Sequence, residues 1–273
     1  MTPGARLSTA IDLLDSILAG DPAGLVLTNW ARRSRYAGSK DRAAVRDIVF
    51  DILRNRRSFA FRAGEETGRG LVLAYAAFHA ELGQNPFVHF SGTHFDADPP
   101  SAGETAAILA NPVPPDPVRL NYPDFLDAEL RRSLGAGFEP VLQAMLGRAP
   151  VDLRVNLGRG TLKNAQDTLA KDDISTQTVP GVPTALRVTG NPRRVNNSTA
   201  FTSGLVDLQD ASSQAVALFA RPEPGMNVLD YCAGGGGKAL ALYDAVGPKG
   251  QVTAHDIATV RMNDLPARAA RAG

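Results

Sequence analysis

The stretch Asn227-Val228-Leu229-Asp230-Tyr231-Cys232-Ala233-Gly234-Gly235-Gly236-Gly237-Lys238 decides how the C-terminal part of the chain folds. A short apolar run predicts a buried strand, and four consecutive glycines follow it closely. The next residues, 238–246, have a helical pattern, and a second strand is expected over 251–256. The order of strand, glycine loop, helix and strand is typical of the opening unit of a doubly wound nucleotide-binding sheet.

The glycines and the acid at the tip of the second strand together predict a ligand site. In doubly wound sheets, ligands bind beyond the carboxyl ends of the strands, where glycine lets the backbone approach them closely. Asp256 would lie at that edge and could accept hydrogen bonds from ribose hydroxyls. The alternative is that the glycines only form a tight turn between strand and helix.

Three kinds of nucleotide site begin with a glycine-rich loop: a dinucleotide site, an S-adenosylmethionine site and a P-loop. The pattern Gly234-x-Gly236-x-x-Ala239 formally fits the dinucleotide fingerprint, and Asp256 lies near the expected offset. A pyrophosphate would be repelled by Asp230 at the strand end, whereas the sulfonium and ammonium groups of S-adenosylmethionine would be attracted by it. A P-loop is excluded, because Cys232 occupies the position of its first glycine and Lys238 is not followed by Ser or Thr.

The first 148 residues predict a helical bundle. Apolar residues recur at helical spacing over 7–18 and again, after a plausible N-cap at Ser39, over 45–53. A nearly all-apolar helix is expected from Leu71 to Leu82. A long proline-rich connection follows, with at most a short helix near Ala106–Leu109. Two more helices are expected, one from Pro123 to Leu134 and one from Glu139 to Gly147.

An arginine-rich stretch gives this bundle a basic face. Between Arg32 and Arg69 there are eleven Lys or Arg residues and five Asp or Glu residues, although the whole chain carries a net charge of only +1. On the predicted helix that begins at Ser39, arginines 42, 46 and 57 project to one side. The planar guanidinium group suits phosphate contacts, so such a face is typical of nucleic-acid binding, the alternative being an ordinary solvated helix face. The predicted RNA contacts are Arg32, Arg33, Arg35, Arg42, Arg46 and Arg57.

After Pro150 the pattern changes to a small α+β unit. Residues 151–156 alternate like a half-buried strand, 161–170 look helical, and short strands are expected over 176–179 and 185–188.

At this point the chain resembles a known family. Asp230–Lys238 is similar to the cofactor motif D-x-C-A-A-P-G-G-K of the Sun/Fmu-type S-adenosylmethionine-dependent ribosomal RNA 5-methylcytosine methyltransferases. Gly204–Gln214 resembles the family segment ahead of that motif, and Leu153–Asn156 resembles its L-R-V-N strand. The helical N-terminal region is similar to the NusB-like RNA-binding domain of the bacterial members. One departure is that Gly234-Gly235 stand where the family has Ala-Pro, which makes the loop more flexible.

The resemblance implies a mixed fold of three parts. Residues 1–148 would form an all-α NusB-like bundle, and 149–203 a small α+β domain that helps to bind RNA. Residues 204–273 would form an incomplete cofactor domain, the first β-α-β part of a class I methyltransferase (Rossmann-like) α/β domain.

The resemblance also assigns the cofactor contacts. The loop would line the methionine end of S-adenosylmethionine, Asp256 would hold its ribose, and Arg261 falls where the family commonly has an arginine. The predicted cofactor residues are Cys232, Ala233, Gly234, Gly235, Gly236, Gly237, Lys238, Asp256 and Arg261.

By the same resemblance, the activity would be methyl transfer to C5 of cytosine in RNA, with 16S ribosomal RNA as the expected substrate. In the family a cysteine thiolate attacks C6 of the base. That cysteine would lie beyond Gly273, so we assign no catalytic residue and expect weak cofactor binding and no methyl transfer by the chain as given. Cys232 has no identifiable activating base and is expected to shape the loop. The alternatives are a non-catalytic RNA-binding protein with a vestigial cofactor domain and a fragment of an NAD-dependent oxidoreductase.

Composition excludes several other classes. A single cysteine cannot form an internal disulfide or a cysteine-built zinc site. The polar residues His89, His94, Asp96 and Asp98 match no closed metal site, and no metal is expected. No apolar run approaches the roughly 20 residues of a membrane span. We therefore expect a monomeric cytoplasmic protein whose partner is RNA.

Overall fold

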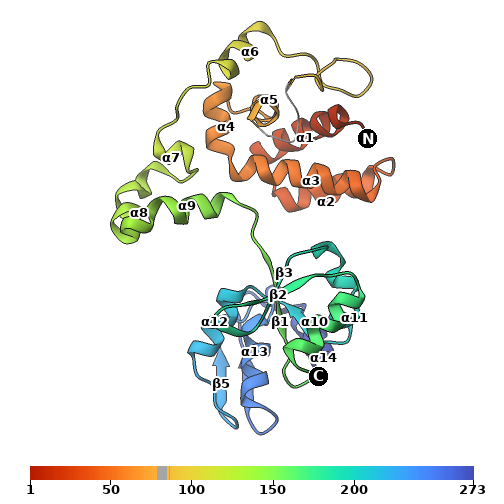
Figure 1. The fold of residues 1–273 in the computed structure, drawn as a ribbon, viewed down its shortest axis with the longest axis vertical. Helices are drawn as coiled ribbons and strands as arrows, with labels where there is room; N and C mark the ends of the chain where they lie inside the picture. Colours follow the sequence, from red (N-terminus) through yellow and green to blue (C-terminus); the bar gives the residue numbers. More distant parts are fainter. Residues whose placement is uncertain (79–84, 86) are drawn as a thin grey trace. The chain divides into compact units, whose positions relative to one another are not determined.

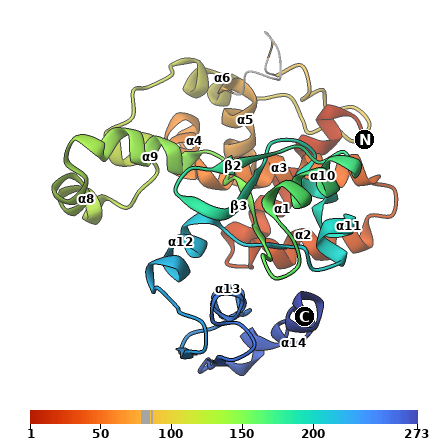
Figure 2. The same ribbon diagram turned by 60° about the horizontal axis from the view of Figure 1, so that its bottom comes forward.

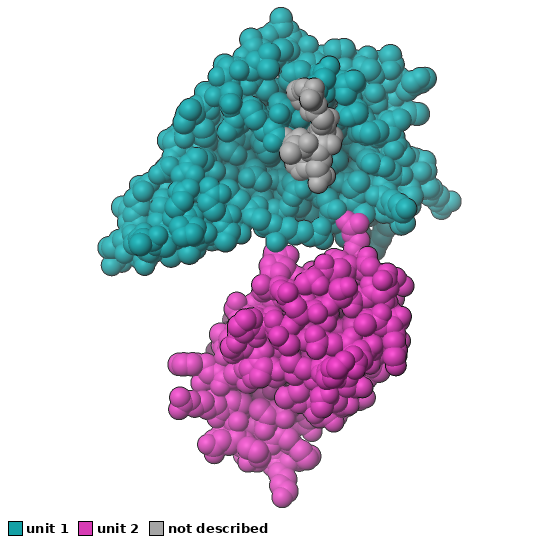
Figure 3. Space-filling model, in the orientation of Figure 1, with its two compact units in different colours: residues 1–148 teal, residues 149–273 magenta. Residues whose placement is uncertain are grey.

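The computed structural model describes residues 1–78, 85 and 87–273, shown as a ribbon in Figure 1. The chain forms two compact units, Met1–Arg148 and Ala149–Gly273 (Figure 3). The first is helical in its described part, and the second combines helices with small sheets, which confirms the prediction of a mixed fold. The division into three domains stays a prediction. No helix in the described ranges is long and apolar enough to cross a bilayer.

The first unit is built from short helices joined by irregular segments. They are α1 (Pro3–Leu18), α2 (Ala23–Arg33), α3 (Ser39–Arg54), α4 (Arg56–Ala63), α5 (Gly68–Phe78), α6 (Ala102–Leu109), α7 (Asp116–Arg119), α8 (Asp127–Leu134) and α9 (Phe138–Leu146), with 3-10 turns at Asp124–Leu126 and Gly135–Gly137.

Helix α5 lies at the centre of the bundle, with α1, α3 and α4 around it (Figure 1). Its residues from Gly70 to Ala76 are all buried, as the apolar pattern predicts. Gly68 allows α1 to approach, because a Cβ there would lie 2.4 Å from the carbonyl oxygen of Ile11. The predicted helix Leu71–Leu82 is confirmed up to Phe78, and its residues 79–82 lie outside the described residues.

The prediction that Arg57 shares a helix with Arg42 and Arg46 is wrong. Helix α3 ends at Arg54, and Asn55 leaves the helical conformation with φ −111° and ψ 20°. The Asn55 side chain donates a hydrogen bond to the Asp51 carbonyl oxygen at 3.0 Å, which satisfies an acceptor at the helix end. Arg57 therefore lies in α4. The N-cap of α3 is Gly38 rather than Ser39, which is the first helical residue.

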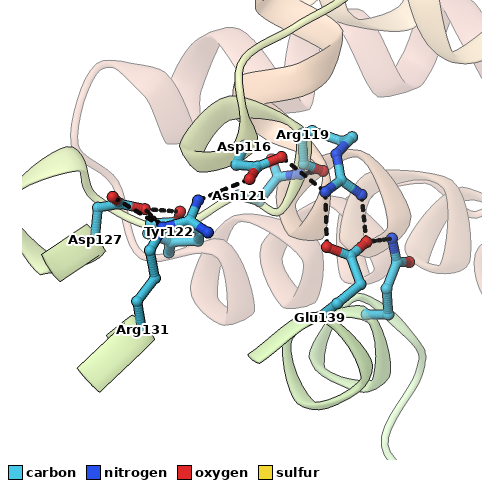
Figure 4. Close-up of polar contacts among 8 residues, drawn as sticks. Asp116, Arg119, Asn121, Tyr122, Asp127, Arg131 and Glu139 are labelled. Atoms are coloured by element: carbon cyan, nitrogen blue, oxygen red, sulfur yellow. Dashed lines mark hydrogen bonds and ion pairs between the residues drawn. The ribbon is translucent and has the colours of Figure 1, made fainter. Parts of the chain in front are cut away.

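Helices α7 to α9 pack around a small apolar cluster and a network of ion pairs (Figure 4). Arg119 pairs with Asp116 and Glu139. Arg131 pairs with Asp116 and Asp127 and lies 4.2 Å from the centre of the Phe138 ring. Half-exposed pairs are each worth no more than about 1 kcal/mol, so the network mainly fixes the orientation of these short helices.

The second unit begins with an antiparallel sheet in the order β2-β3-β1-β4. Its elements are β1 (Val151–Val155), α10 (Leu162–Lys171), β2 (Thr176–Val179), β3 (Val182–Val188), a 3-10 helix (Pro192–Asn197), α11 (Thr199–Thr202), β4 (Val206–Leu208) and α12 (Ala211–Phe219). Leu153 of β1 lies between Leu186 and Leu208 of its neighbours. Strand β4 was not predicted, because three residues are too few to show an alternating pattern.

The second part of this unit is the predicted strand–loop–helix–strand. Its elements are β5 (Asn227–Asp230), α13 (Gly237–Val246), β6 (Gln251–Ala254), a 3-10 turn (Thr259–Met262) and α14 (Leu265–Ala272). Strands β5 and β6 are parallel, with Asp230 opposite Ala254. Helices α13 and α14, both labelled in Figure 2, line a cavity of about 630 Å³ near β6.

One buried ion pair joins the antiparallel sheet to helix α13. Arg154 of β1 is 2% exposed and donates a hydrogen bond to the Asp244 carboxylate on α13. A buried charge is tolerated when it is paired, and removing one partner leaves the other charge uncompensated. The pair therefore fixes α13, and with it the glycine loop, against the antiparallel sheet.

We predict that Asp244→Ala lowers the free energy of unfolding of the second unit by about 3–5 kcal/mol, because Arg154 loses its counter-charge. The control is Asp167→Ala, which breaks the exposed pair with Lys163 and should cost less than about 1 kcal/mol. Urea denaturation followed by circular dichroism measures both. Equal losses in the two variants would contradict the assignment.

Candidate functional site

The glycine loop connects β5 to α13 through two left-handed residues. Gly234 has φ +50° and Gly236 has φ +79°, conformations that glycine adopts without strain. The N–H of Gly236 donates to the Ala233 carbonyl oxygen at 2.9 Å and closes the turn. A Cβ on Gly236 would lie 2.1 Å from Cδ1 of Leu265, so α14 also excludes a side chain there.

The Asp256 side chain holds this loop by accepting a hydrogen bond from the loop's backbone. It is 5% exposed, and its Oδ2 accepts the Gly234 N–H at 2.9 Å. Its Oδ1 accepts the Ala258 N–H, also at 2.9 Å, and Arg261 Nη1 lies 3.6 Å from Oδ2. These N–H groups, the one of Ala258 first, together with Arg261 hold the pKa of Asp256 below its ordinary value, although burial opposes the shift. The structure thus brings together three of the predicted residues, and the ribose contact of Asp256 stays a prediction.

A second set of contacts, which the sequence analysis missed, fixes the start of the loop on β6. The Ala233 N–H donates to the His255 carbonyl oxygen at 2.8 Å. The ring of His255 stacks on that of Tyr231 with centres 4.7 Å apart, and its Nδ1 lies 3.0 Å from the Tyr231 carbonyl oxygen. Cys232, between Tyr231 and Ala233 in the chain, is exposed.

Helix α14 reaches the loop through an arginine that was also missed. Arg268 donates from Nη1 to the Gly235 carbonyl oxygen, and its Nε and Nη2 lie 3.2 and 2.7 Å from Asp207 Oδ2 on β4. Arg271 Nη2 lies 2.9 Å from the other oxygen of Asp207. Asp207 and Arg268 are 61 positions apart, and no local pattern links them.

Two polar side chains beside the loop are buried without a protein partner. Within residues 1–78, 85 and 87–273, these are Oδ2 of Asp230, at the end of β5, and both amide atoms of Gln209, just after β4. Asp230 is 7% exposed and Gln209 is 8% exposed. Burying a polar group without a hydrogen bond costs free energy, so these atoms are suited to a bound ligand. The sequence offered no signal for Gln209, because its burial comes from the tertiary packing.

The predicted RNA-binding arginines do not gather at one place. Arg46 lines a cavity of about 760 Å³ in the first unit. Arg42 instead donates to the Ser34 carbonyl oxygen at 3.2 Å, and Arg57 pairs with Asp124 at 2.8 Å. Arginines 32, 33 and 35, at the end of α2 and just beyond it, are not among the residues that line this cavity.

The cavity brings Arg46 together with arginines that were not predicted. Along α3, Arg46, Phe50 and Arg54 follow one another at intervals of four residues and share one helix face. Arg6 of α1 and Arg148, which follows α9, complete the basic lining. Arg54, Arg148 and Arg6 are oriented by aspartates 51, 47 and 41, the last two at 3.2 and 2.8 Å. The aromatic ring among guanidinium groups was not evident from local sequence, because three elements contribute to it.

The polar loop of histidines and aspartates forms hydrogen bonds within itself and to the N-terminal segment. Asp96 accepts from the hydroxyl groups of Ser91 at 2.8 Å and of Thr2 at 3.3 Å. Among the residues that the structure describes, no group of three His, Cys, Asp or Glu side chains could hold a metal ion.

The sequence of this chain is similar to those of RNA-modifying enzymes. Residues 122–196 match the family model of the ferredoxin-like domain of RsmF/B-like methyltransferases. The probable ribosomal RNA small subunit methyltransferase B of Synechocystis sp. is 29% identical over 154 residues, which are 56% of this chain and 34% of that protein. The ribosomal RNA small subunit methyltransferase B of Yersinia pestis is 32% identical over 142 residues, 52% of this chain and 33% of that protein.

Two solved structures share the fold. The structure titled PH0851 superposes on 100% of this chain and 68% of its own, with a TM-score of 0.70 and 19% identity. The methyltransferase homolog protein from Pyrococcus horikoshii covers 57% of this chain and 52% of its own, with a TM-score of 0.53 and 25% identity.

These findings give first the class that part of the chain resembles: residues 122–196 match the model of the ferredoxin-like domain of RsmF/B-like methyltransferases. They also confirm the resemblance to the Sun/Fmu-type family, since the relatives are ribosomal RNA small subunit methyltransferases B. The chain spans about a third of the length of these relatives.

The hydrogen bond from Gly234 to Asp256 gives a pH prediction. A carboxyl group whose pKa is lowered by folding stabilises the fold fully above its unfolded pKa, near 4, and the contribution is lost as the pH falls through the folded pKa. The amide proton of Gly234 should therefore keep its hydrogen-bonded NMR shift from neutral pH to about 4 and lose it only below. Asp256→Asn should abolish this pH dependence. A transition centred above pH 4 would contradict the lowered pKa.

Proposed function

We propose that this chain binds S-adenosylmethionine and RNA as part of an RNA cytosine-5 methyltransferase that acts on 16S ribosomal RNA. The observation that carries the proposal is the loop Gly234–Gly237 at the carboxyl end of β5, tied to Asp256 just beyond the end of the parallel strand β6. Ligands of doubly wound sheets bind at this edge. The names of the relatives support a ribosomal RNA substrate.

In this proposal the second unit contains the opening strands of a Rossmann-like methyltransferase domain. Strands β5 and β6 with α13 supply the first β-α-β unit, and strands β1, β2 and β3 of the antiparallel sheet next to it lie within the RsmF/B-like match over residues 122–196. The first unit would be the NusB-like RNA-binding bundle.

The residues at the loop fit S-adenosylmethionine better than a dinucleotide. Asp230 places a buried, unpartnered carboxylate oxygen at the end of β5. That oxygen would repel a pyrophosphate and would attract the sulfonium or ammonium group of S-adenosylmethionine. The loop residues Cys232–Lys238 would line the methionine end, and Asp256 with Arg261 would lie beside the ribose. When bound, the cofactor supplies the methyl group, and these residues bind and orient it.

RNA binding is proposed for the arginine-lined cavity of the first unit. Single-stranded RNA is bound by positive grooves that contact phosphates and by aromatic rings on which bases stack. Arg46 and Arg54 flank Phe50 on one face of α3, and Phe50 is 37% exposed. This arrangement suits one unstacked nucleotide, with its phosphate on the arginines and its base against the ring.

Titration calorimetry with S-adenosylmethionine and with NAD⁺ tests the cofactor. We expect binding of the first and none of the second. Asp230→Asn should weaken S-adenosylmethionine about tenfold, because the buried group loses its negative charge. The control Asp173→Asn, at an exposed pair with Arg194, should change nothing. Tighter binding of NAD⁺ would favour the oxidoreductase alternative, and RNA binding without either ligand would favour the non-catalytic one.

Fluorescence anisotropy with a labelled single-stranded fragment of 16S ribosomal RNA tests the cavity. Arg46→Glu should weaken binding about tenfold and reduce the slope of log affinity against log salt by about 0.7, the value for one lost phosphate contact. Phe50→Ala should weaken binding without changing that slope. The control Arg132→Glu reverses the charge of an exposed arginine on α8. If it weakens binding as much as Arg46→Glu, the cavity is not the RNA site.

A further inference from the structure

The side-chain amide of Gln209 is buried but makes no hydrogen bond within the described residues. Its main chain is well used: the N–H donates to the Asp152 carbonyl oxygen at 3.1 Å, and its carbonyl oxygen accepts from the Gln214 side chain at 2.9 Å. Its own amide is 8% exposed, and neither Nε2 nor Oε1 has a partner in the described chain. Gln214 nearby is the usual case of a buried amide. It is 1% exposed, its Nε2 donates a hydrogen bond to the Gln209 carbonyl oxygen, and its Oε1 accepts one from the Thr184 hydroxyl at 2.8 Å.

The amide of Gln209 is directed at the first turn of α13. Its Nε2 lies 3.7 Å from the point where a Cβ on Gly237 would be, which is ordinary van der Waals distance. Gly237 is the first residue of this ten-residue helix, and within the described part of the molecule no side chain caps it. The first N–H groups of a helix lack internal partners and carry partial positive charge, so they favour an anion.

The nearby charges also favour an anion. Arg268 Nη2 lies 3.7 Å from the same point on Gly237. Asp207 binds both Arg268 and Arg271, so two positive charges share one negative charge and the group keeps a net charge of +1. Lys238 in the first turn of α13 adds another cation.

The anion should be small and belong to a molecule that also carries a positive group. A phosphate would have to approach the buried carboxylate of Asp230, which repels it. An α-amino acid end has a carboxylate and an ammonium group on one carbon, and it can satisfy both kinds of partner.

We propose that Gln209 Nε2, with the first turn of α13, binds the carboxylate of the amino-acid end of the adenosyl cofactor. This inference rests on the proposed function, because it assumes that the loop takes S-adenosylmethionine. Gln209 is then a binding residue outside the glycine loop. Arg268 is a positioning residue that holds Gly235 through its carbonyl oxygen.

Two matched ligands separate this contact from the rest of the site. S-adenosylhomocysteine and 5′-methylthioadenosine are both uncharged at sulfur, and only the first has the amino-acid end. In calorimetry on the whole chain, Gln209→Ala should weaken S-adenosylhomocysteine about tenfold, the loss for a hydrogen bond to a charged group, and leave methylthioadenosine unchanged. Gln209→Glu should weaken the first ligand further, because two carboxylates would meet.

Thermal unfolding of the free protein tests whether Gln209 has a purely structural role. Since its amide has no partner, Gln209→Leu should leave the melting temperature unchanged or raise it, while it still weakens S-adenosylhomocysteine. The control Gln177→Leu, at an exposed position on β2, should change neither ligand.

The outcomes separate the inference from the proposed function. If the unchanged chain binds both ligands and the Gln209 variants bind them as well as it does, the inference fails and the cofactor proposal stands. Equal weakening of both ligands also overturns the inference, since it shows a general distortion of the loop. If the unchanged chain binds neither S-adenosylmethionine nor either test ligand, both proposals fail.

Discussion

The pairing of one buried charge constrains the second unit. Arg154 is almost completely enclosed, so its guanidinium must have a carboxylate beside it, and Asp244 on α13 provides it. This requirement sets where α13 lies against β1. Because the glycine loop ends in the first turn of α13, the position of the candidate cofactor site follows from an ion pair at the other end of the same helix. The antiparallel sheet is therefore the support of the candidate site.

Around that support, two carboxylates are engaged within the protein, one by backbone N–H groups and the other by arginine side chains. Asp256 accepts two N–H groups, and Asp207 accepts two arginines from α14. These contacts make the loop a defined shape before any ligand arrives, which lowers the ordering cost of binding. The polar atoms of Asp230 and Gln209 are the exception, because they are enclosed but left unpaired. A few precisely placed polar groups in a largely pre-formed site are typical of a binding pocket.

The sequence predicted those features that have a local signal. Four glycines after an apolar run predicted the strand, the loop and α13, and the motif around Asp230 led to a family resemblance that the relatives confirm. Features that depend on distant residues could not be found in this way. Arg268 meets Gly235 and Asp207 only after folding, and helical periodicity does not show that α3 ends at Arg54. The same applies to Arg148 and Arg6 beside the face of α3.

The glycine at 235 has a consequence for substitutions at position 268. The family motif that this loop resembles has proline there, which would stiffen the loop covalently, whereas this chain holds the loop by the contact between Arg268 and the Gly235 carbonyl oxygen. A Cβ at 235 would lie only 3.2 Å from Nη1 of that arginine, so the two solutions exclude each other in part. The effects of substitutions at 235 and 268 should therefore not be additive. Proline at 235 would require the Arg268 guanidinium to move, and the loop would then exchange one restraint for the other.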